Sequence, residues 1–272
     1  MNTIVYQPVE AIRPYVSQIM VMENAGRGNE AFSFPFYADG YPGLIYHQTS
    51  GGMYLNNASK GLSAFFVYGQ TVNPIELMAY GDYRMIVFYL HPHVLRSLIG
   101  IRSNELTDGC LDLSLLHHSR ARETLRQLED SESATDQVSL ISSYIHQLAK
   151  LNDSHPDHTV QYAVTRLSGA GGKIPISSVL EPLHVTARTF ERRFKEHVGV
   201  SPKLFARICQ FQSTLRQMEN NNYFKLSDLA FDNGYADQSH FIRAFREFTG
   251  QSPLLFQKSR HEWQEPAYAG SF

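Results

Sequence analysis

The spacing of apolar positions changes near residue 110 and divides the chain into a strand-rich part and a helical part. In the first part, short alternating runs are separated by turns rich in Gly, Pro and Asp, which is typical of strands. These runs lie at residues 17–22, 32–37, 43–47, 62–68, 75–80 and 84–90. Their spacing predicts a small antiparallel β-barrel or sandwich over residues 1–110, with a short helix from His91 through Ile99.

Helical spacing of apolar residues begins after Asp112. It predicts helices over residues 113–128 and 135–151, which can pack on the β-rich domain or on a second copy of the chain. A polar break at residues 152–157 separates them from the rest. We therefore expect an α+β chain in four parts: a β-rich regulatory domain (1–110), a helical linker or dimerisation segment (111–154), an all-α domain (155–260) and a tail (261–272).

One pattern occurs twice between residues 176 and 256. Six residues recur 51 positions later in the same order, namely Phe190, Phe194, Gly199, Ser201, Pro202 and Phe205 as Phe241, Phe245, Gly250, Ser252, Pro253 and Phe256. Upstream of this block the offset is 50, so the second copy has one more residue in its turn. Each copy has an apolar helical face, a break, and a second apolar face that ends at glycine. The repeat therefore predicts two helix-turn-helix units, with Thr186 as the N-cap of the second helix in the first unit.

A helix is expected to link the two units over residues 202–219, where apolar residues form a stripe that three asparagines end. At about 1.5 Å per residue such a helix spans roughly 27 Å. This length is comparable with the ~34 Å of one DNA turn, which separates successive major-groove faces on one side of a duplex. The spacing therefore suits double-stranded DNA as a partner.

The polar face of the second helix in each unit consists mostly of hydrogen-bond donors. Arginine can bond guanine with two hydrogen bonds and glutamine can bond adenine in the same way. A solvated charged face is the alternative interpretation, but its duplication in a helix-turn-helix frame favours DNA contact. We expect Arg188, Arg192, Gln238 and Arg243 to reach base edges, and Lys195 and His240 to contact phosphate or to set the helix. The full set of predicted DNA-binding residues is Arg188, Glu191, Arg192, Lys195, Gln238, Ser239, His240, Arg243 and Arg246.

The paired units of AraC/XylS-type transcription regulators resemble two stretches of this chain, VTARTFERRFKEHVGVSPKLF and LAFDNGYADQSHFIRAFREFTGQSPLLF. In the second stretch the signature runs from Ala230 through Gly234 to Pro253. The first unit departs from it, because Pro182 lies late in its first helix and His184 stands where the family commonly has glycine. The resemblance implies a sequence-specific DNA-binding regulator, not an enzyme, without a cofactor. RNA polymerase and a second copy of the chain are further candidate partners.

The distribution of charged residues supports the division into a β-rich part and a helical part. The chain has a formal net charge of −2, but residues 155–260 hold 14 Lys and Arg against 9 Asp and Glu. A basic domain beside an acidic remainder is expected when only one of them meets phosphate. Cys110 and Cys209 are far apart and show neither disulfide nor metal spacing. Because no apolar run is long enough to span a bilayer, we expect a soluble, cytoplasmic protein that does not contact membranes.

The β-rich part resembles, in architecture only, the cupin-like sensor domains of AraC-type regulators. Aromatic residues on its strands can fill the core or surround a small effector. Arg84 opens the apolar run RMIVFYL and needs an anionic partner, either a protein carboxylate or a ligand. The predicted effector-binding residues are Tyr46, Tyr54, Phe66, Tyr68, Tyr80, Arg84 and Phe88.

Two alternatives remain for this part of the chain. One is a cupin-like, metal-dependent enzyme domain, for which His91, His93 and the pair His117-His118 are the candidate ligands. A metal site needs three or four converging groups, so these histidines predict no metal by themselves. The other is a scaffold for dimerisation that binds no ligand.

Overall fold

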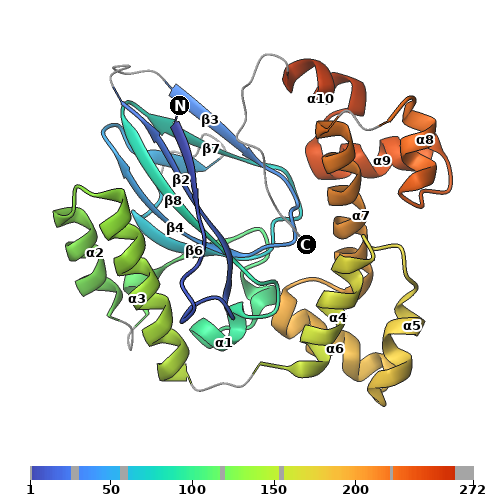
Figure 1. Cartoon of the computed structure of the whole chain (residues 1–272), viewed down its shortest axis with the longest axis horizontal. Coiled ribbons are helices and arrows are strands. Elements are labelled where there is room, and N and C mark those ends of the chain that lie inside the picture. Colours follow the sequence, from blue (N-terminus) through green and yellow to red (C-terminus); the bar gives the residue numbers. More distant parts are fainter. Residues whose placement is uncertain are drawn as a thin grey trace.

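The computed structural model describes residues 2–25, 31–55, 61–116, 120–152, 156–220 and 223–260. Its strand-rich half and its helical half lie side by side (Figure 1). The strands are β1 (Asn2–Tyr6), β2 (Val16–Asn24), β3 (Ala31–Phe36), β4 (Gly43–Thr49), β5 (Met53–Leu55), β6 (Phe65–Tyr68), β7 (Ile75–Tyr80), β8 (Tyr83–Leu90) and β9 (Cys110–Asp112). The helices are α1 (Leu95–Ile99), α2 (Ala121–Asp130), α3 (Ala134–Asn152), α4 (His158–Gly169), α5 (Ile176–Leu180), α6 (Ala187–Val198), α7 (Pro202–Glu219), α8 (Leu226–Asp232), α9 (Gln238–Thr249) and α10 (Pro253–Arg260).

The larger of two sheets has six strands in the order β1-β2-β8-β4-β6-β9, and its neighbours are antiparallel. Strand β8 lies inside it, between β2 and β4. Because successive side chains of a strand point to opposite faces, Met85 and Val87 face one core, while Ile86 and Phe88 face another. Both faces are buried, which explains why the sequence of β8 is apolar from Met85 to Leu90.

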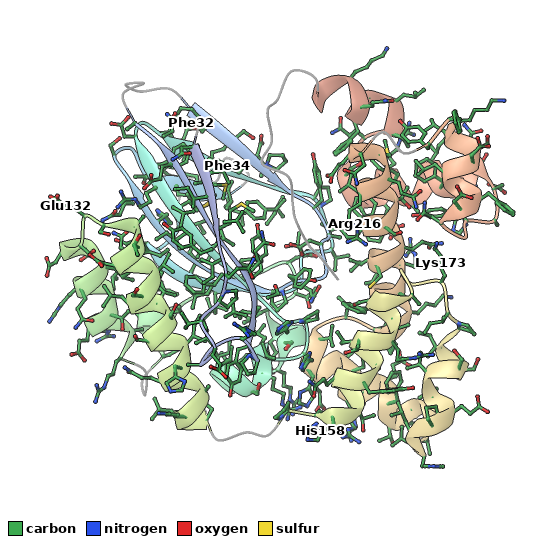
Figure 2. All side chains as sticks on the ribbon, viewed as in Figure 1. Phe32, Phe34, Glu132, His158, Lys173 and Arg216 are labelled. Atoms are coloured by element: carbon green, nitrogen blue, oxygen red, sulfur yellow. The ribbon has the colours of Figure 1, made fainter. Side chains whose placement is uncertain are left out.

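The smaller sheet has three strands in the order β3-β7-β5. Its inner face packs on the larger sheet, and side chains of both sheets make up one core. Phe32 and Phe34 of β3, labelled in Figure 2, stand edge-on to Tyr83, each with ring centroids 5.1 Å apart. Gly43 allows the ring of Tyr68 to pack on β4, because a Cβ at this position would lie 2.4 Å from the phenol oxygen.

Helices α1, α2 and α3 cover the other face of the larger sheet (Figure 1). Tyr144 of α3 packs on Phe65 of β6 with ring centroids 5.3 Å apart. Ile141 and Leu128 in the same core are fully buried. Burial of this apolar surface stabilises the half by roughly 25 cal/mol per Å² removed from water.

The helical half has two cores, and α7 contributes to both. Phe205 and Cys209 belong to the core formed with α4, α5 and α6. Phe211 and Leu215 belong to the core formed with α8, α9 and α10. The loop before α5 comes close to α7 at Gly172, where a Cβ would lie 1.9 Å from the carbonyl oxygen of Ala206. Helix α7 therefore joins the two helix-turn-helix units, because it contributes side chains to both cores.

Most strand predictions are confirmed, with shifts of a few residues at their ends. The predicted strand at residues 62–68 is shorter, because β6 begins at Phe65. Three short strands were not predicted, namely β1, β5 and β9. β9 pairs with β6, so the sheet continues to Asp112.

The predicted helix over residues 113–128 is wrong in its first part. Asp112 accepts a hydrogen bond from the backbone N–H of Ser114, and a single 3-10 turn follows over Leu113–Leu115. An α-helix starts only at Ala121. The second helix, predicted over residues 135–151, is confirmed as α3, and the link predicted over residues 202–219 is α7 with the same bounds. His117, His118, part of the predicted boundary at 152–157 and the tail at 261–272 lie outside the described residues.

Candidate nucleic-acid interface

The first helix-turn-helix unit consists of α5, a 3-10 turn and α6. The turn covers Glu181–Leu183 and contains Pro182, whose ring cannot continue an α-helix. His184 then adopts a left-handed conformation with φ of 50°. Thr186 caps α6, since its side chain accepts a hydrogen bond of 3.2 Å from the backbone N–H of Thr189. Gly199 ends the helix with φ of 103°.

The second unit repeats this arrangement with α8 and α9. Gly234 provides the left-handed residue of the turn with φ of 76°. Asp237 is the N-cap of α9 and accepts a hydrogen bond of 2.6 Å from the backbone N–H of His240. Gly250 ends α9 in the left-handed region. The helices begin 50 positions apart in α5 and α8 and 51 apart in α6 and α9, so the extra residue lies in the second turn as predicted.

The structure places the predicted DNA-binding residues of α6 on its exposed side. Arg188, Glu191, Arg192 and Lys195 are all exposed. Lys195 lies 3.9 Å from Glu191, and Arg192 lies 3.3 Å from Glu196; the two residues of each pair are one helical turn apart. These pairs hold the side chains along the helix, although each exposed pair contributes only about 0.5 kcal/mol.

On α9, Gln238, Ser239, Arg243 and Arg246 are exposed, whereas His240 is half-buried. The His240 ring stands edge-on to Tyr235 at 5.5 Å, and its Nδ1 accepts a hydrogen bond of 3.4 Å from the backbone N–H of Ala236. These contacts give His240 a role in setting the turn. The exposed members form a donor-rich face like that of α6.

Polar contacts fix the distance between the two units. Arg207 of α7 lies 2.5 Å from Glu247 of α9, and its guanidinium stacks over the Phe248 ring at 5.4 Å. Lys173, in the loop before α5 and labelled in Figure 2, donates to the carbonyl of Asp232 at 2.7 Å. The loop that precedes the first unit therefore contacts the end of α8 in the second unit directly.

Two segments of the strand-rich half reach the ends of both second helices. We call residues 69–74 and 103–110 together the interdomain strap. Thr107 donates to the carbonyl of Gly199 at 2.8 Å, and Ser103 donates to the carbonyl of His197 at 2.6 Å. Pro74 lies against Gly250, where a Cβ would be 3.7 Å from its ring. The strap therefore contacts the carboxyl end of α6 and the glycine that ends α9.

The two halves also meet through an ion pair and a buried loop. Arg96 of α1 lies 2.6 Å from Glu196 of α6, and this hydrogen bond is the largest cause of the lowered pKa of Glu196. Gln212 of α7 donates to the carbonyl of Ala38 at 2.7 Å. Burial raises the pKa of Asp39, in the same loop, from 3.8 to about 7. None of these contacts has a local sequence signal, and sequence reasoning missed them.

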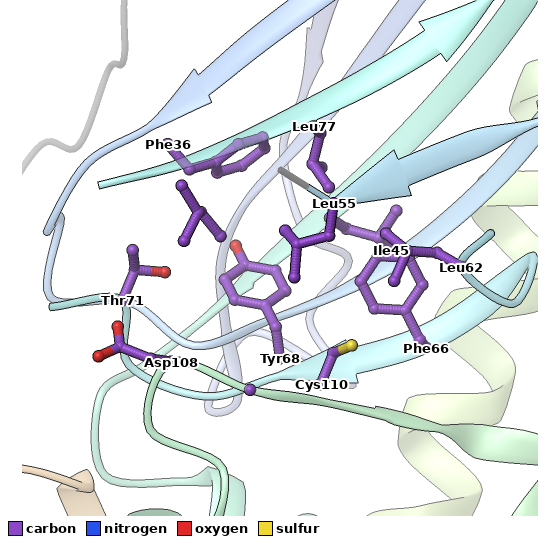
Figure 3. Close-up of a pocket in the computed structure, with 12 residues that line it drawn as sticks. Phe36, Ile45, Leu55, Leu62, Phe66, Tyr68, Thr71, Leu77, Asp108 and Cys110 are labelled. Atoms are coloured by element: carbon purple, nitrogen blue, oxygen red, sulfur yellow. The ribbon is translucent and has the colours of Figure 1, made fainter. Parts of the chain in front are cut away.

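A pocket opens between the two sheets, and Figure 3 shows its apolar walls. The space within it, with solvent at its entrance, is about 430 Å³. Phe36, Ile45 and Leu77 line it, and Thr71 and Asp108 of the strap stand on one side.

Of the predicted effector-binding residues, Phe66 and Tyr68 line this pocket. Tyr46 and Phe88 face the opposite core, beneath the helices. Tyr54 and Tyr80 pack on each other with ring centroids 5.7 Å apart. Arg84 has a protein carboxylate as its anionic partner, because it bonds Glu23 and also donates to the carbonyl of Glu132 at 2.7 Å. The structure therefore does not bring the seven residues together.

Of the histidines proposed as metal ligands, the structure describes His91, which is half-buried, and His93, which is buried. His91 and His93 stack with ring centroids 6.1 Å apart, and burial lowers the pKa of His93 to about 4. Within the described ranges, no three His, Cys, Asp or Glu side chains come together as a metal site. None of the helices described there combines the length and the hydropathy that crossing a bilayer requires.

The two halves of the chain match different protein families. Residues 180–259 match the helix-turn-helix domain family HTH_18, and residues 4–112 match a domain of unknown function, DUF6597. The transcriptional activator RhaS of Escherichia coli O139:H28 is 24% identical over 196 residues, which cover 64% of this chain and 68% of RhaS. These matches support an AraC/XylS-type transcription regulator.

Other proteins are also similar to this chain. An uncharacterised HTH-type transcriptional regulator of Haemophilus influenzae is 27% identical over 84 residues, which cover 31% of this chain and 28% of that protein. Among solved structures, ToxT of Vibrio cholerae has 12% identity and a TM-score of 0.49, and the match covers 89% of this chain and 97% of ToxT. The curated relatives with names are transcription regulators, which argues against an enzymatic role.

Proposed function

We propose that this AraC-type regulator places α6 and α9 in two successive major-groove segments on one side of the duplex. The observation that carries the proposal is a pair of capped helices with exposed, donor-rich faces, held at one distance by the shared helix α7. A recognition helix contacts base edges mainly through the residues of its amino-terminal turns. Arg188 and Arg192 occupy these turns in α6, and Gln238 and Arg243 occupy them in α9.

Substitution separates base contact from phosphate contact. Arg243→Ala is expected to cost about 1 to 3 kcal/mol on the specific site and to relax preference at one base position. Lys195→Ala is expected to weaken specific and random duplexes alike, because phosphate contacts carry no sequence information. Arg126→Ala, which removes an exposed arginine from α2, is the matched control.

Binding to a random pool of duplexes, followed by sequencing, provides the operator for these measurements. Equal weakening of specific and random DNA by Arg243→Ala would refute base contact by this residue. A salt titration of the wild type should show affinity falling linearly with log salt, at a slope of about −0.9 per neutralised phosphate.

For the strand-rich half we propose a regulatory, cupin-like domain that responds to a small molecule. Two sheets around an apolar core and a pocket between them support this role. We place the division at 1–110 for this domain, 111–154 for the helical segment and 155–260 for the DNA-binding domain. RNA polymerase and a second copy of the chain are the proposed protein partners. Light scattering across a concentration series tests the second copy, and a single mass of 30.9 kDa throughout would exclude it.

A further inference from the structure

The second helices of the two units share a pair of charged residues. Arg192 and Glu196 lie one turn apart in α6. Arg243 and Glu247 take the same places in α9, 51 positions later. In each helix the arginine belongs to the exposed, donor-rich face, and residues one turn apart are neighbours on a helix surface. Each glutamate is bonded by an arginine from another element, and that element differs between the units.

In the first unit the Glu196 carboxylate bridges two arginines. One oxygen lies 3.3 Å from a guanidinium nitrogen of Arg192, and the other lies 2.6 Å from one of Arg96 in α1, which lies beside α6 (Figure 1). The bond from Arg96 lowers the pKa of Glu196 most, and the charges of Arg192 and Arg102 add to this effect. The Glu196 side chain is 18% exposed and that of Arg192 is 66% exposed. An ionised carboxylate held by the strand-rich half therefore bonds an arginine that projects into solvent.

The part of α6 that carries Glu196 is held by its neighbours in the chain. Ser103 of the strand-rich half donates to the carbonyl of His197 at 2.6 Å. Arg193 pairs with Asp157, the N-cap of α4, at 2.7 Å. These contacts keep the carboxylate in place relative to α1. Because an exposed arginine otherwise samples many rotamers, a bond to a fixed acceptor restricts the directions in which its guanidinium points.

The second unit provides an internal comparison. Glu247 lies 2.5 Å from Arg207 of α7, whose guanidinium also stacks over the Phe248 ring. The Glu247 side chain is 49% exposed, so it is less enclosed than Glu196. Among the residues that the structure describes, no ion pair joins Glu247 to Arg243. The glutamate therefore bonds the arginine of its own helix in the first unit and an arginine of α7 in the second.

We propose that Glu196 is a positioning residue for DNA readout, which orients Arg192 toward one base while Arg96 holds it, so that the strand-rich half takes part in sequence recognition. The inference rests on the proposed placement of α6 in the major groove. A guanidinium has five N–H donors, so the bond to Glu196 leaves enough of them for the two acceptors of a guanine. The negative charge of Glu196 also offsets those of the surrounding arginines, which limits binding to the phosphates of a duplex of any sequence.

Selection of duplexes from a random pool by the full-length protein provides the operator, and Arg192→Ala identifies the base position whose preference depends on Arg192. Glu196→Gln keeps the size of the side chain and removes its charge. We expect preference at this same position to fall about threefold or more, with the other positions unchanged, because the guanidinium loses its fixed acceptor. Affinity for random duplexes should rise about twofold, because one negative charge near the phosphates is removed.

Three further variants complete the experiment. Arg96→Met removes the cation that holds the carboxylate, and it should reduce preference at the same position about twofold. The double variant Arg192→Ala/Glu196→Gln should lose no more preference at this position than Arg192→Ala alone, because the two residues act as one unit. Glu247→Gln, at the equivalent place in α9, is the matched control and should leave preference at this position unchanged. Thermal unfolding checks that each variant is folded at the temperature of the binding measurement.

The positioning role and the placement of α6 fail through different outcomes. Unchanged base preference in Glu196→Gln, or an equal loss in Glu247→Gln, would overturn the positioning role alone. A uniform loss of affinity for specific and random duplexes in Glu196→Gln would also overturn it, since a residue that only stabilises the fold gives this result. Full preference in Arg96→Met would remove the strand-rich half from recognition. If no operator is selected, or if Arg192→Ala changes no preference, the placement of α6 is wrong and the positioning role falls with it.

Discussion

The two helix-turn-helix units have the same caps and the same helix ends but different turns. The first passes through a 3-10 turn and a left-handed histidine, and the second through a left-handed glycine with one more residue. In both units the second helix begins at a residue whose side chain caps it and ends at a glycine. The comparison teaches that the helix ends are the constant part of the motif, whereas its turn accepts different residues if one of them can adopt positive φ.

The units also differ in how the strand-rich half holds them. The first is held by polar contacts, namely the Arg96 to Glu196 pair and the bonds from Ser103 and Thr107. The second is held by apolar contacts, in which Ala38 enters its core and Tyr37 packs on Phe256 with ring centroids 5.5 Å apart. Salt should therefore act more strongly on the docking of the first unit.

The largest expected effect comes from the two cores. Phe194→Ala and Phe245→Ala remove equivalent, fully buried rings, and each should lower the free energy of unfolding by about 3 to 5 kcal/mol. Chemical denaturation of the full chain measures both. A loss below about 1 kcal/mol in either variant would show that its core can collapse around the cavity and that the units are not equivalent in packing.

The next effect concerns Asp39, in the loop that docks on α7. Its pKa is raised to about 7 in the folded protein from 3.8, so unfolding releases a proton between these values. The contribution of Asp39 to stability should therefore be greatest below pH 4, fall as pH rises toward 7, and then level off. Asp39→Asn cannot lose a proton and keeps an acceptor for the backbone N–H of Tyr41.

The melting temperature of this variant should exceed that of the wild type at pH 8, and the gain should shrink toward pH 4. The groups that face Asp39, which are Tyr41 and Tyr89, do not titrate in this window, because burial raises the pKa of both well above it. Parallel pH profiles for the two proteins would show that another group causes the dependence.

A smaller effect distinguishes the turns. Gly234→Ala should cost about 1 kcal/mol, because the left-handed backbone and not lack of space opposes the methyl group. His184→Gly should change stability by less than about 0.5 kcal/mol, since relief of strain and the added entropy of the unfolded chain oppose each other. Gly169→Ala is the control, because no atom lies within 4 Å of its Cβ position. Thermal unfolding that shows equal losses at 234 and 169 would contradict the role of the turn.

The smallest effect is at the ion pair of the first unit. Arg96→Ala should lower stability by no more than about 1 kcal/mol, since the Arg96 side chain is 36% exposed and solvent screens the pair. Hydrogen exchange should nevertheless speed up at the carboxyl end of α6 and not at that of α9. Equal acceleration at both helix ends would mean that the two units are docked as one surface.

Local signals in the sequence predicted the helical half well. The bounds of α7, the cap at Thr186 and the glycines that end α6 and α9 follow from periodicity and capping, which depend on neighbours along the chain. The strand positions also followed from alternation. Short strands such as β5 were missed, because three residues are too few to show a period.

Contacts between segments that are distant along the chain could not be predicted from the sequence. Arg84 showed that an anionic partner was needed, but only the pairing of β2 with β8 identifies Glu23. Aromatic residues on strands were predicted to surround one ligand. In the structure, Tyr46 faces one side of the larger sheet and Phe66 faces the other. A shift of either strand by one residue would turn its side chains to the opposite face. The strap depends on loops whose contacts have no periodic pattern at all.

The shared helix α7 has a consequence for cooperativity. Because α7 contributes side chains to both cores, the loss of this helix would expose both of them, and we expect the two units to unfold together. The two repeats would then form one foldon, unlike repeat arrays in which each unit contacts its neighbours through separable interfaces. The amide protons of α7 should consequently be among the last in the helical half to exchange with solvent, and the two units should melt in one transition.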